Sequence, residues 1–169
     1  MNHLIRLVYA SRSTQASQRG SVESSIGSIL AQSRRNNQKD QIGGVLFFGD
    51  GYFFQCLEGE ESQVLQTYAR ITRDSRHTGA TILQNKPITK RLFNDWSMKY
   101  VPTATEVQAL LKREGYRRFV PLEFSLPMIE MLLDYFQRAQ AGEALPTIAA
   151  NEEPVRKGFW NRMTGWLRA

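Results

Sequence analysis

The sequence predicts an α+β protein with a ferredoxin-like, mixed five-stranded sheet that carries two helices on one face. Apolar runs of strand length and helical patterns follow one another in the order strand–helix–strand–strand–helix–strand–strand. The tripeptide Gly49-Asp50-Gly51 separates two of the apolar runs, and an Asp-Gly pair in this position is typical of a tight hairpin. The length of 169 residues fits one compact domain.

The first strand and the first helix are expected within residues 4–37. Leu4 to Tyr9 are nearly all apolar, which is typical of a central strand covered on both faces. Ser11–Gly20 is polar and is expected to be a loop, after which Ser21 can cap a helix. We expect this helix to end near Asn36-Asn37, because Asn tolerates the left-handed backbone found at helix ends. Its inward stripe is expected to consist of Val22, Ile26, Ile29, Leu30 and Ser33.

A hairpin and a second helix should follow. The predicted hairpin strands are Ile42–Phe48 and Tyr52–Leu57. Glu58-Gly59-Glu60-Glu61 is expected to open the second helix, because acidic side chains stabilise a helix N-terminus. Arg76-His77 is expected at the end of this helix, where the helix dipole favours cations.

The later part of the chain changes from strands to helices. Strands are predicted at Thr81–Leu83 and Trp96–Val101, and helices at Thr105–Arg113 and Pro127–Gln140. The apolar side chains of these helices could cover the open face of the sheet, support self-association or bind a partner protein. Covering the sheet is favoured, because the face opposite the first two helices otherwise lacks a cover.

This pattern divides the chain into an α+β domain at residues 1–102, a helical extension at 103–142, and a linker with a basic amphipathic tail at 143–169. The tail segment Val155–Ala169 could bind a partner, fold onto its own domain or contact an anionic membrane. Apolar residues recur there at helical spacing: Phe159, Trp160, Met163, Trp166 and Leu167.

Composition excludes several classes of function. The single cysteine, Cys56, excludes an internal disulfide, and with two histidines the chain lacks the side chains for a cysteine- or histidine-rich metal site. No apolar run approaches the ~20 residues of a membrane span, and no signal peptide is recognisable, so a cytoplasmic protein is expected. The net charge of +6 is thinly spread, which makes direct nucleic-acid binding an unfavoured alternative.

Two polar residues stand inside the apolar strands. Tyr9 ends the first strand, and its hydroxyl needs a partner if it is buried. Gln55 shares one strand face with Phe53 and Leu57, so its amide needs hydrogen-bond partners inside the protein unless the strand lies at an exposed edge. Both arrangements are open at this point.

Five segments of the first hundred residues match one known family in the right order. They are Leu7-Val8-Tyr9-Ala10-Ser11, then the stretch from Asn36 to Leu46, then Phe53-Phe54-Gln55-Cys56-Leu57-Glu58-Gly59, Arg73-Asp74-Ser75-Arg76-His77 and Trp96-Ser97-Met98. Together they closely resemble a BLUF domain, a blue-light sensor that uses flavin. The remaining third resembles the helical extension of short, stand-alone BLUF proteins, so no attached enzyme domain is expected.

The resemblance implies roles for particular side chains. Tyr9 would donate an electron and a proton to the excited flavin, and Gln55 would hydrogen-bond both Tyr9 and the ring. Asn37 would hold the carbonyl edge of the ring, while Ile29 and Ile71 would clamp it. Trp96 and Met98 match a pair linked to signalling. The full set expected around the flavin is Tyr9, Ile29, Ser33, Asn36, Asn37, Gln55, Arg70, Ile71, Asp74, Arg76 and His77.

The expected function is therefore a photoreceptor without enzymatic turnover, with FAD as cofactor. After illumination, the amide of Gln55 would be left rotated, tautomerised or both, and the absorption of the flavin would shift to the red. The expected receiver is a protein partner of the regulator class, contacted through the C-terminal helices, and homo-oligomers are possible. Alternatives are a small ferredoxin-like enzyme or a basic module that binds nucleic acid or a membrane.

Overall fold

The computed structural model describes residues 3–14, 19–94, 98–100 and 104–141. In these ranges the chain forms a five-stranded sheet in the order β4-β1-β3-β2-β5. The elements are β1 (Leu4–Ser13), α1 (Arg19–Lys39), β2 (Gly43–Gly49), β3 (Tyr52–Glu60), α2 (Glu61–Ile71), β4 (His77–Pro87), β5 (Met98–Tyr100), α3 (Ala104–Arg113), the 3-10 turn η1 (Pro121–Glu123) and α4 (Leu126–Ala141).

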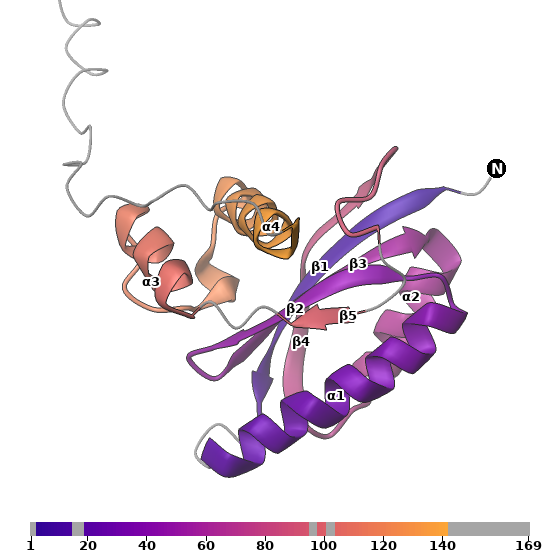
Figure 1. Ribbon diagram of the computed structural model, residues 1–169, viewed down its shortest axis with the longest axis horizontal. Helices are drawn as coiled ribbons and strands as arrows, with labels where there is room; N and C mark the ends of the chain where they lie inside the picture. Colours follow the sequence, from indigo (N-terminus) through magenta and orange to yellow (C-terminus); the bar gives the residue numbers. More distant parts are fainter. Residues whose placement is uncertain (1–2, 15–18, 95–97, 101–103, 142–169) are drawn as a thin grey trace, which may run out of the picture.

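The sheet is mixed and lies between two layers of helices. β1 pairs antiparallel with β3 and β4, β2 pairs antiparallel with β3, and only β2 and β5 are parallel. Figure 1 shows α1 and α2 on one face and α3 and α4 on the other. The predicted fold class and order of elements are confirmed. None of the helices in the described residues is long and apolar enough to cross a membrane.

The tight turn between β2 and β3 fixes their register. Asp50 and Gly51 both have positive φ, 47° and 84°, as a two-residue hairpin turn requires. Asp50 also accepts a hydrogen bond on Oδ2 from the backbone N–H of Phe119, at 2.6 Å. The hairpin tip therefore anchors the segment between α3 and η1 as well as joining the two strands.

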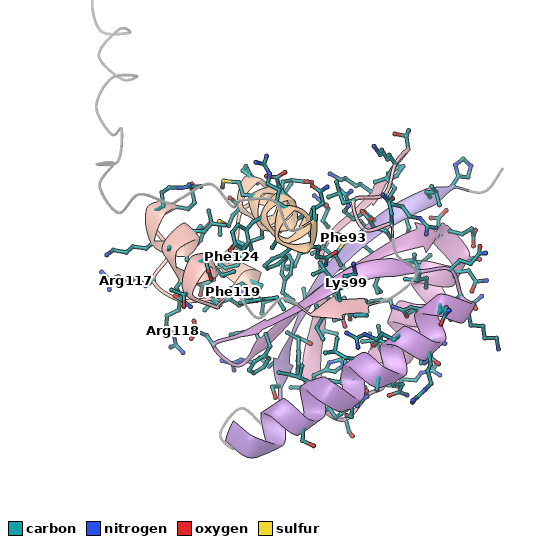
Figure 2. The ribbon with its side chains drawn as sticks, viewed as in Figure 1. Phe93, Lys99, Arg117, Arg118, Phe119 and Phe124 are labelled. Atoms are coloured by element: carbon teal, nitrogen blue, oxygen red, sulfur yellow. The ribbon has the colours of Figure 1, made fainter. Side chains whose placement is uncertain are left out.

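Alternation along β3 sends its side chains into two separate cores. Tyr52, Phe54 and Cys56 pack with apolar side chains of α3 and α4 and of the loops on either side of η1, while Phe53 and Leu57 pack with α1 and α2. Phe119 and Phe124 lie between the sheet and the C-terminal helices (Figure 2). The helical extension thus covers the sheet face opposite α1 and α2, as expected from the need to bury that face.

Charged side chains connect α4 to the sheet, at the border of the core between the sheet and the C-terminal helices. The buried carboxylate of Glu58 accepts from Arg6 Nε at 2.6 Å and from the backbone N–H of Phe93 at 2.9 Å. On α4, Glu130 accepts from Gln84 Nε2 at 2.8 Å and pairs with Lys86. Burying Glu58 is tolerable because both of its oxygens are hydrogen-bonded.

Several predicted boundaries in the first half are wrong. β1 continues to Ser13, so Ser11 lies in a strand, because this segment pairs with β3 and β4 on its two sides. α1 begins at Arg19, which places Ser21 inside the helix and not at its cap. The helix also continues past Asn36-Asn37 to Lys39, and the left-handed residue is Gln41, with φ 54°.

The second helix is shorter than predicted at both ends. Glu58 and Gly59 belong to β3, and Glu60 is the N-cap, whose carboxylate accepts from the backbone N–H of Gln63. The helix ends at Ile71, so Arg76-His77 does not lie at a helix end, and His77 instead begins β4. Of the two later strands, β4 is much longer than the predicted Thr81–Leu83. The described part of the predicted strand Trp96–Val101, Met98–Tyr100, is a strand, and the rest of that prediction lies outside the described residues.

A close approach between β2 and its neighbours leads to a stability prediction. A Cβ added at Gly44 would meet the carbonyl oxygen of Cys56 at 2.1 Å and the methyl group of Met98 at 3.0 Å. We expect Gly44→Ala to lower the free energy of unfolding by about 1–3 kcal/mol in urea denaturation, because backbone must shift to accommodate the added methyl group.

Gly27→Ala is the matched control for this change. A Cβ at Gly27 meets nothing within 4 Å, and the residue lies inside α1. We expect it to raise the free energy of unfolding by up to about 1 kcal/mol, because Gly is a poor helix former. Equal urea midpoints for Gly44→Ala and the unaltered protein would contradict the close packing of β2, β3 and β5.

Candidate functional site

A cleft of about 230 Å³ lies between α1, α2 and the sheet. Every residue predicted to surround a flavin lines it, including Ile29 from α1 and Ile71 from α2, which offer apolar side chains to a flat ring. The full lining is Tyr9, Ser11, Ile29, Gln32, Ser33, Asn36, Asn37, Leu46, Phe53, Gln55, Thr67, Arg70, Ile71, Arg73, Asp74, Arg76 and His77.

Three side chains form a hydrogen-bonded chain at the floor of the cleft. Tyr9 and Gln55 are register partners on neighbouring strands, and the Tyr9 hydroxyl donates to Gln55 Oε1. Gln55 Nε2 then donates to the sulfur of Met98 at 3.3 Å. Gln55 is 2% exposed and lies on the central strand of the sheet, so the alternative of an edge-strand Gln facing solvent is wrong.

The phenol of Tyr9 is held in its neutral form. Burial raises its pKa far above the ordinary value, and nearby Tyr68 and Asp74 raise it further. The ring of Tyr68 meets that of Tyr9 edge-on, with centroids 5.2 Å apart. Tyr9 therefore keeps its proton for the hydrogen bond to Gln55 across the whole physiological pH range.

At one end of the cleft, Arg76 forms hydrogen bonds with the segment before β4 and with α1. Its guanidinium donates from Nε to Asp74, from Nη1 to Ser28 at 2.7 Å and from Nη2 to Gln32 at 2.8 Å. The hydrogen bonds from Arg76 lower the pKa of Asp74, and the same pairing raises the pKa of Arg76. Arg76 thus ties the segment before β4 to α1, a function that its predicted position at a helix end did not suggest.

Near the C-terminal end of α1, Arg70 of α2 bridges the two helices. Its Nη2 donates to Thr67 at 3.1 Å within α2 and pairs with Asp40 at 3.3 Å, just beyond α1. Arg70 is about half exposed, so this ion pair adds little stability. Arg70 also lines the cleft, so this ion pair lies at its border.

Comparison with known proteins identifies the family. The profile described as "BLUF: Sensors of blue-light using FAD" matches residues 4–99. The chain belongs to the BLUF family. Its blue-light sensing domain uses FAD as cofactor, which agrees with the resemblance carried by the sequence motifs.

Known BLUF proteins match this chain over different lengths. Photoactivated adenylate cyclase subunit beta of Euglena gracilis is 33% identical over 101 residues, which are 57% of this chain and 11% of that protein. The blue light- and temperature-regulated antirepressor BluF of Escherichia coli (strain K12) is 38% identical over 52 residues, 31% of this chain and 13% of that protein. The chain thus spans little more than a tenth of these two relatives.

A solved structure matches a larger share of the molecule. The photo-activated state of BlsA aligns with a TM-score of 0.74 and 31% sequence identity, covering 79% of this chain and 94% of BlsA. The likeness therefore extends beyond the residues matched by the family profile and includes part of the helical extension.

The polar atoms of this BLUF cleft fit a flavin ring. Three buried atoms in its lining have no hydrogen-bond partner within the described residues: Asn37 Nδ2, Ser11 Oγ and His77 Nδ1. Leaving such groups unpaired costs about 1–3 kcal/mol each, which a ligand with carbonyl and N–H groups along one edge would recover. Ile29 and Ile71 supply the apolar surface that a flat ring requires.

Six lining residues were missed by the sequence analysis: Ser11, Gln32, Leu46, Phe53, Thr67 and Arg73. Two of them had a usable signal, since Ser11 follows Tyr9 by two positions on a strand and Thr67 precedes Ile71 by four on a helix. Leu46 is the register partner of Gln55, which only the hairpin register reveals. Of the two predicted signalling residues, Met98 is in contact with Gln55, and Trp96 lies outside the described residues.

The cleft leads to a prediction about His77. Burial lowers the pKa of its imidazole, although Asp74 opposes this effect. The unfolded chain therefore binds more protons than the folded chain between the lowered pKa and about 6.5. The stability contributed by neutral His77 should be complete above pH ~6.5 and decline as the pH falls below it.

The measurement is an NMR titration of the protein without flavin. We expect the His77 imidazole to titrate with a midpoint below 6.5, with its resonance assigned by its loss in His77→Gln. The urea midpoint should also fall between pH 7 and pH 5.5, and less so in His77→Gln. A titration midpoint above 6.5 would show that the imidazole is not buried as described.

Proposed function

We propose that this BLUF protein is a blue-light photoreceptor without enzymatic turnover, whose signal is a rearrangement of the hydrogen bonds of Gln55 and whose receiver is a regulatory protein. The observation that carries the proposal is the position of the Gln55 amide. Its oxygen accepts from Tyr9 and its nitrogen donates to Met98, so one rotation of the amide changes both contacts. The family favours a sensor over the alternative of a small enzyme.

The residues that would hold FAD come from both helices and the sheet. Asn37 and Ser11 offer buried polar atoms without partners, and Ile29 and Ile71 flank the space between the helices. Ser33, Asn36, Arg70, Asp74, Arg76 and His77 complete the predicted set around the ring and its ribityl or phosphate part. When bound, FAD supplies the absorption of blue light and, once excited, a strong oxidant.

Tyr9 is the proposed electron and proton donor. It is buried, neutral and already hydrogen-bonded to Gln55, so its proton can move along that bond when an electron leaves the phenol. When the electron and the proton return, Gln55 is left rotated, tautomerised or both. In the rotated amide, the oxygen faces the sulfur of Met98 in place of the N–H, and the hydrogen bond to Met98 is lost.

Losing the hydrogen bond to Met98 could transmit the change at Gln55 to the C-terminal helices. Met98 lies on β5, a short strand at the edge of the sheet, and α3 begins at Ala104, shortly after β5 ends. α4 packs on the sheet face opposite the cleft. We propose that Met98, or Trp96 two positions before it in the sequence, shifts after illumination and changes how these helices contact a partner protein.

The proposed organisation follows from this route. Residues 1–102 form the photosensor domain, 103–142 the output extension, and 143–169 a linker and tail. The names of the relatives support a regulatory output, since one is an antirepressor and another an adenylate cyclase subunit. We further propose a cytoplasmic location and self-association of the chain, whereas direct binding to nucleic acid is not part of the proposal.

Tyr9→Phe tests the mechanism. We expect the protein loaded with FAD to shift its flavin absorption to the red under blue light and to recover in the dark. Tyr9→Phe should bind FAD and lose the normal red shift, because the ring remains while the hydroxyl that bonds Gln55 is removed. Absorption spectra before and after illumination give the readout.

Tyr116→Phe is the control, since this tyrosine packs in the core on the opposite face of the sheet. It should retain the full red shift and dark recovery. A full red shift in Tyr9→Phe would refute the role of Tyr9, and failure of the unaltered protein to take up FAD would refute the proposed function altogether.

A further inference from the structure

The position of Met98 depends on a strand with few restraints of its own. Within the described residues, β5 lies at the edge of the sheet and pairs with β2 alone, through Gly44↔Met98, Val45↔Lys99 and Leu46↔Tyr100. A thioether is also a weak hydrogen-bond acceptor, so the bond from Gln55 cannot by itself hold Met98 in place. Nevertheless, the Met98 side chain is fully buried beside Gln55.

An arginine on α1 supplies an additional restraint. Arg34 Nε donates a hydrogen bond to the backbone carbonyl of Met98 at 3.1 Å. Figure 1 shows α1 passing below β5, and the two elements are in contact. A hydrogen bond with a charged donor is stronger than a neutral one, which makes this contact significant for an edge strand with one described neighbour in the sheet.

Arg34 belongs to the same helix as several cleft residues. It follows Ser33 by one position and precedes Asn37 by three, and both of these neighbours line the cleft. The Arg34 side chain therefore joins the helix that borders the candidate flavin site to the strand that carries the sulfur acceptor of Gln55. Ser33 and Asn37 face the cleft, whereas Arg34 reaches around toward the sheet edge.

We infer that Arg34 is a positioning residue that holds the Met98 backbone and thereby keeps the Met98 sulfur within reach of Gln55 Nε2. It would bias an equilibrium between Met98 beside Gln55 and Met98 displaced, which is the switch of the proposed function on which this inference rests. Arg34 binds the backbone carbonyl of Met98, so its influence on Gln55 passes through Met98.

NMR spectra of protein with ¹³C-methyl-labelled methionine test this inference, with and without FAD. In Arg34→Ala we expect the Met98 methyl resonance in the dark to move, in the protein loaded with FAD, toward the position it takes in the illuminated unaltered protein. Hydrogen exchange of the β5 amides should become roughly 2- to 10-fold faster, as expected from the loss of one hydrogen bond. Met98→Leu assigns the resonance.

Two further variants separate positioning from general effects of charge. Arg34→Lys keeps a donor on a long stem and should restore at least half of the change in the Met98 resonance. Arg35→Ala removes the next arginine, which is also exposed on α1, and should leave the resonance and the β5 exchange unchanged. Arg34 is itself exposed, so its removal leaves no buried cavity.

The result that overturns the inference is a Met98 resonance and β5 exchange in Arg34→Ala equal to those of the unaltered protein, or a change of the same size in Arg35→Ala. The spectra recorded without FAD show the effect of Arg34 on Met98 independently of any photochemistry. An unaltered protein that shows no red shift with FAD would instead refute the proposed function, while the effect of Arg34 on Met98 would still be measured.

Discussion

The arrangement of the cleft depends on one constraint, the burial of a primary amide on the central strand of the sheet. Gln55 has donors and acceptors to satisfy, and no water-exposed edge is available to it in the described structure. Tyr9 meets the amide oxygen from β1, and Met98 meets the nitrogen from β5. The contacts therefore depend on which way the amide points, with its oxygen toward Tyr9 and its nitrogen toward Met98. Rotating the amide by half a turn changes both hydrogen bonds together.

The strand that carries Gln55 contacts both layers of helices, so a rearrangement of its amide can affect the face of the sheet opposite the cleft. Side chains of β3 alternate between the face that carries the cleft and an aromatic core shared with α3 and α4. Glu58, three residues after Gln55, holds Arg6 and also the backbone N–H of Phe93, in the segment that leads toward β5. Glu58 thus holds the chain at Phe93, and Arg34 holds the backbone carbonyl of Met98.

Sequence patterns predicted those features that depend on local periodicity. The order of elements follows from apolar runs, the hairpin from Asp50-Gly51, and the facing of Gln55 with Phe53 from strand alternation. The set of cleft residues came from the family resemblance, since no spacing rule alone brings Asn37 and His77 to one cavity. All of the predicted cofactor residues do line the cleft, although their contacts with FAD remain a prediction.

The features that were missed depend on contacts between distant parts of the chain. The acidic run at Glu58 suggested a helix start, but this carboxylate is paired with Arg6, 52 positions away, and therefore stays in the strand. Gln55 could not be assigned to the interior until the strand order placed β3 in the centre. Likewise, no sequence pattern indicated a role for Arg34, because its partner is the Met98 carbonyl, 64 positions away.

The most direct test of the central claim is a light-minus-dark infrared difference spectrum of the protein loaded with FAD, recorded with and without ¹³C,¹⁵N-labelled glutamine. If the signal is a change in the Gln55 amide, side-chain amide bands that shift with the label should appear in the spectrum. The same bands should be absent when Gln55 is replaced by Leu. A difference spectrum with a normal red shift of the flavin but no band sensitive to glutamine labelling would contradict the account.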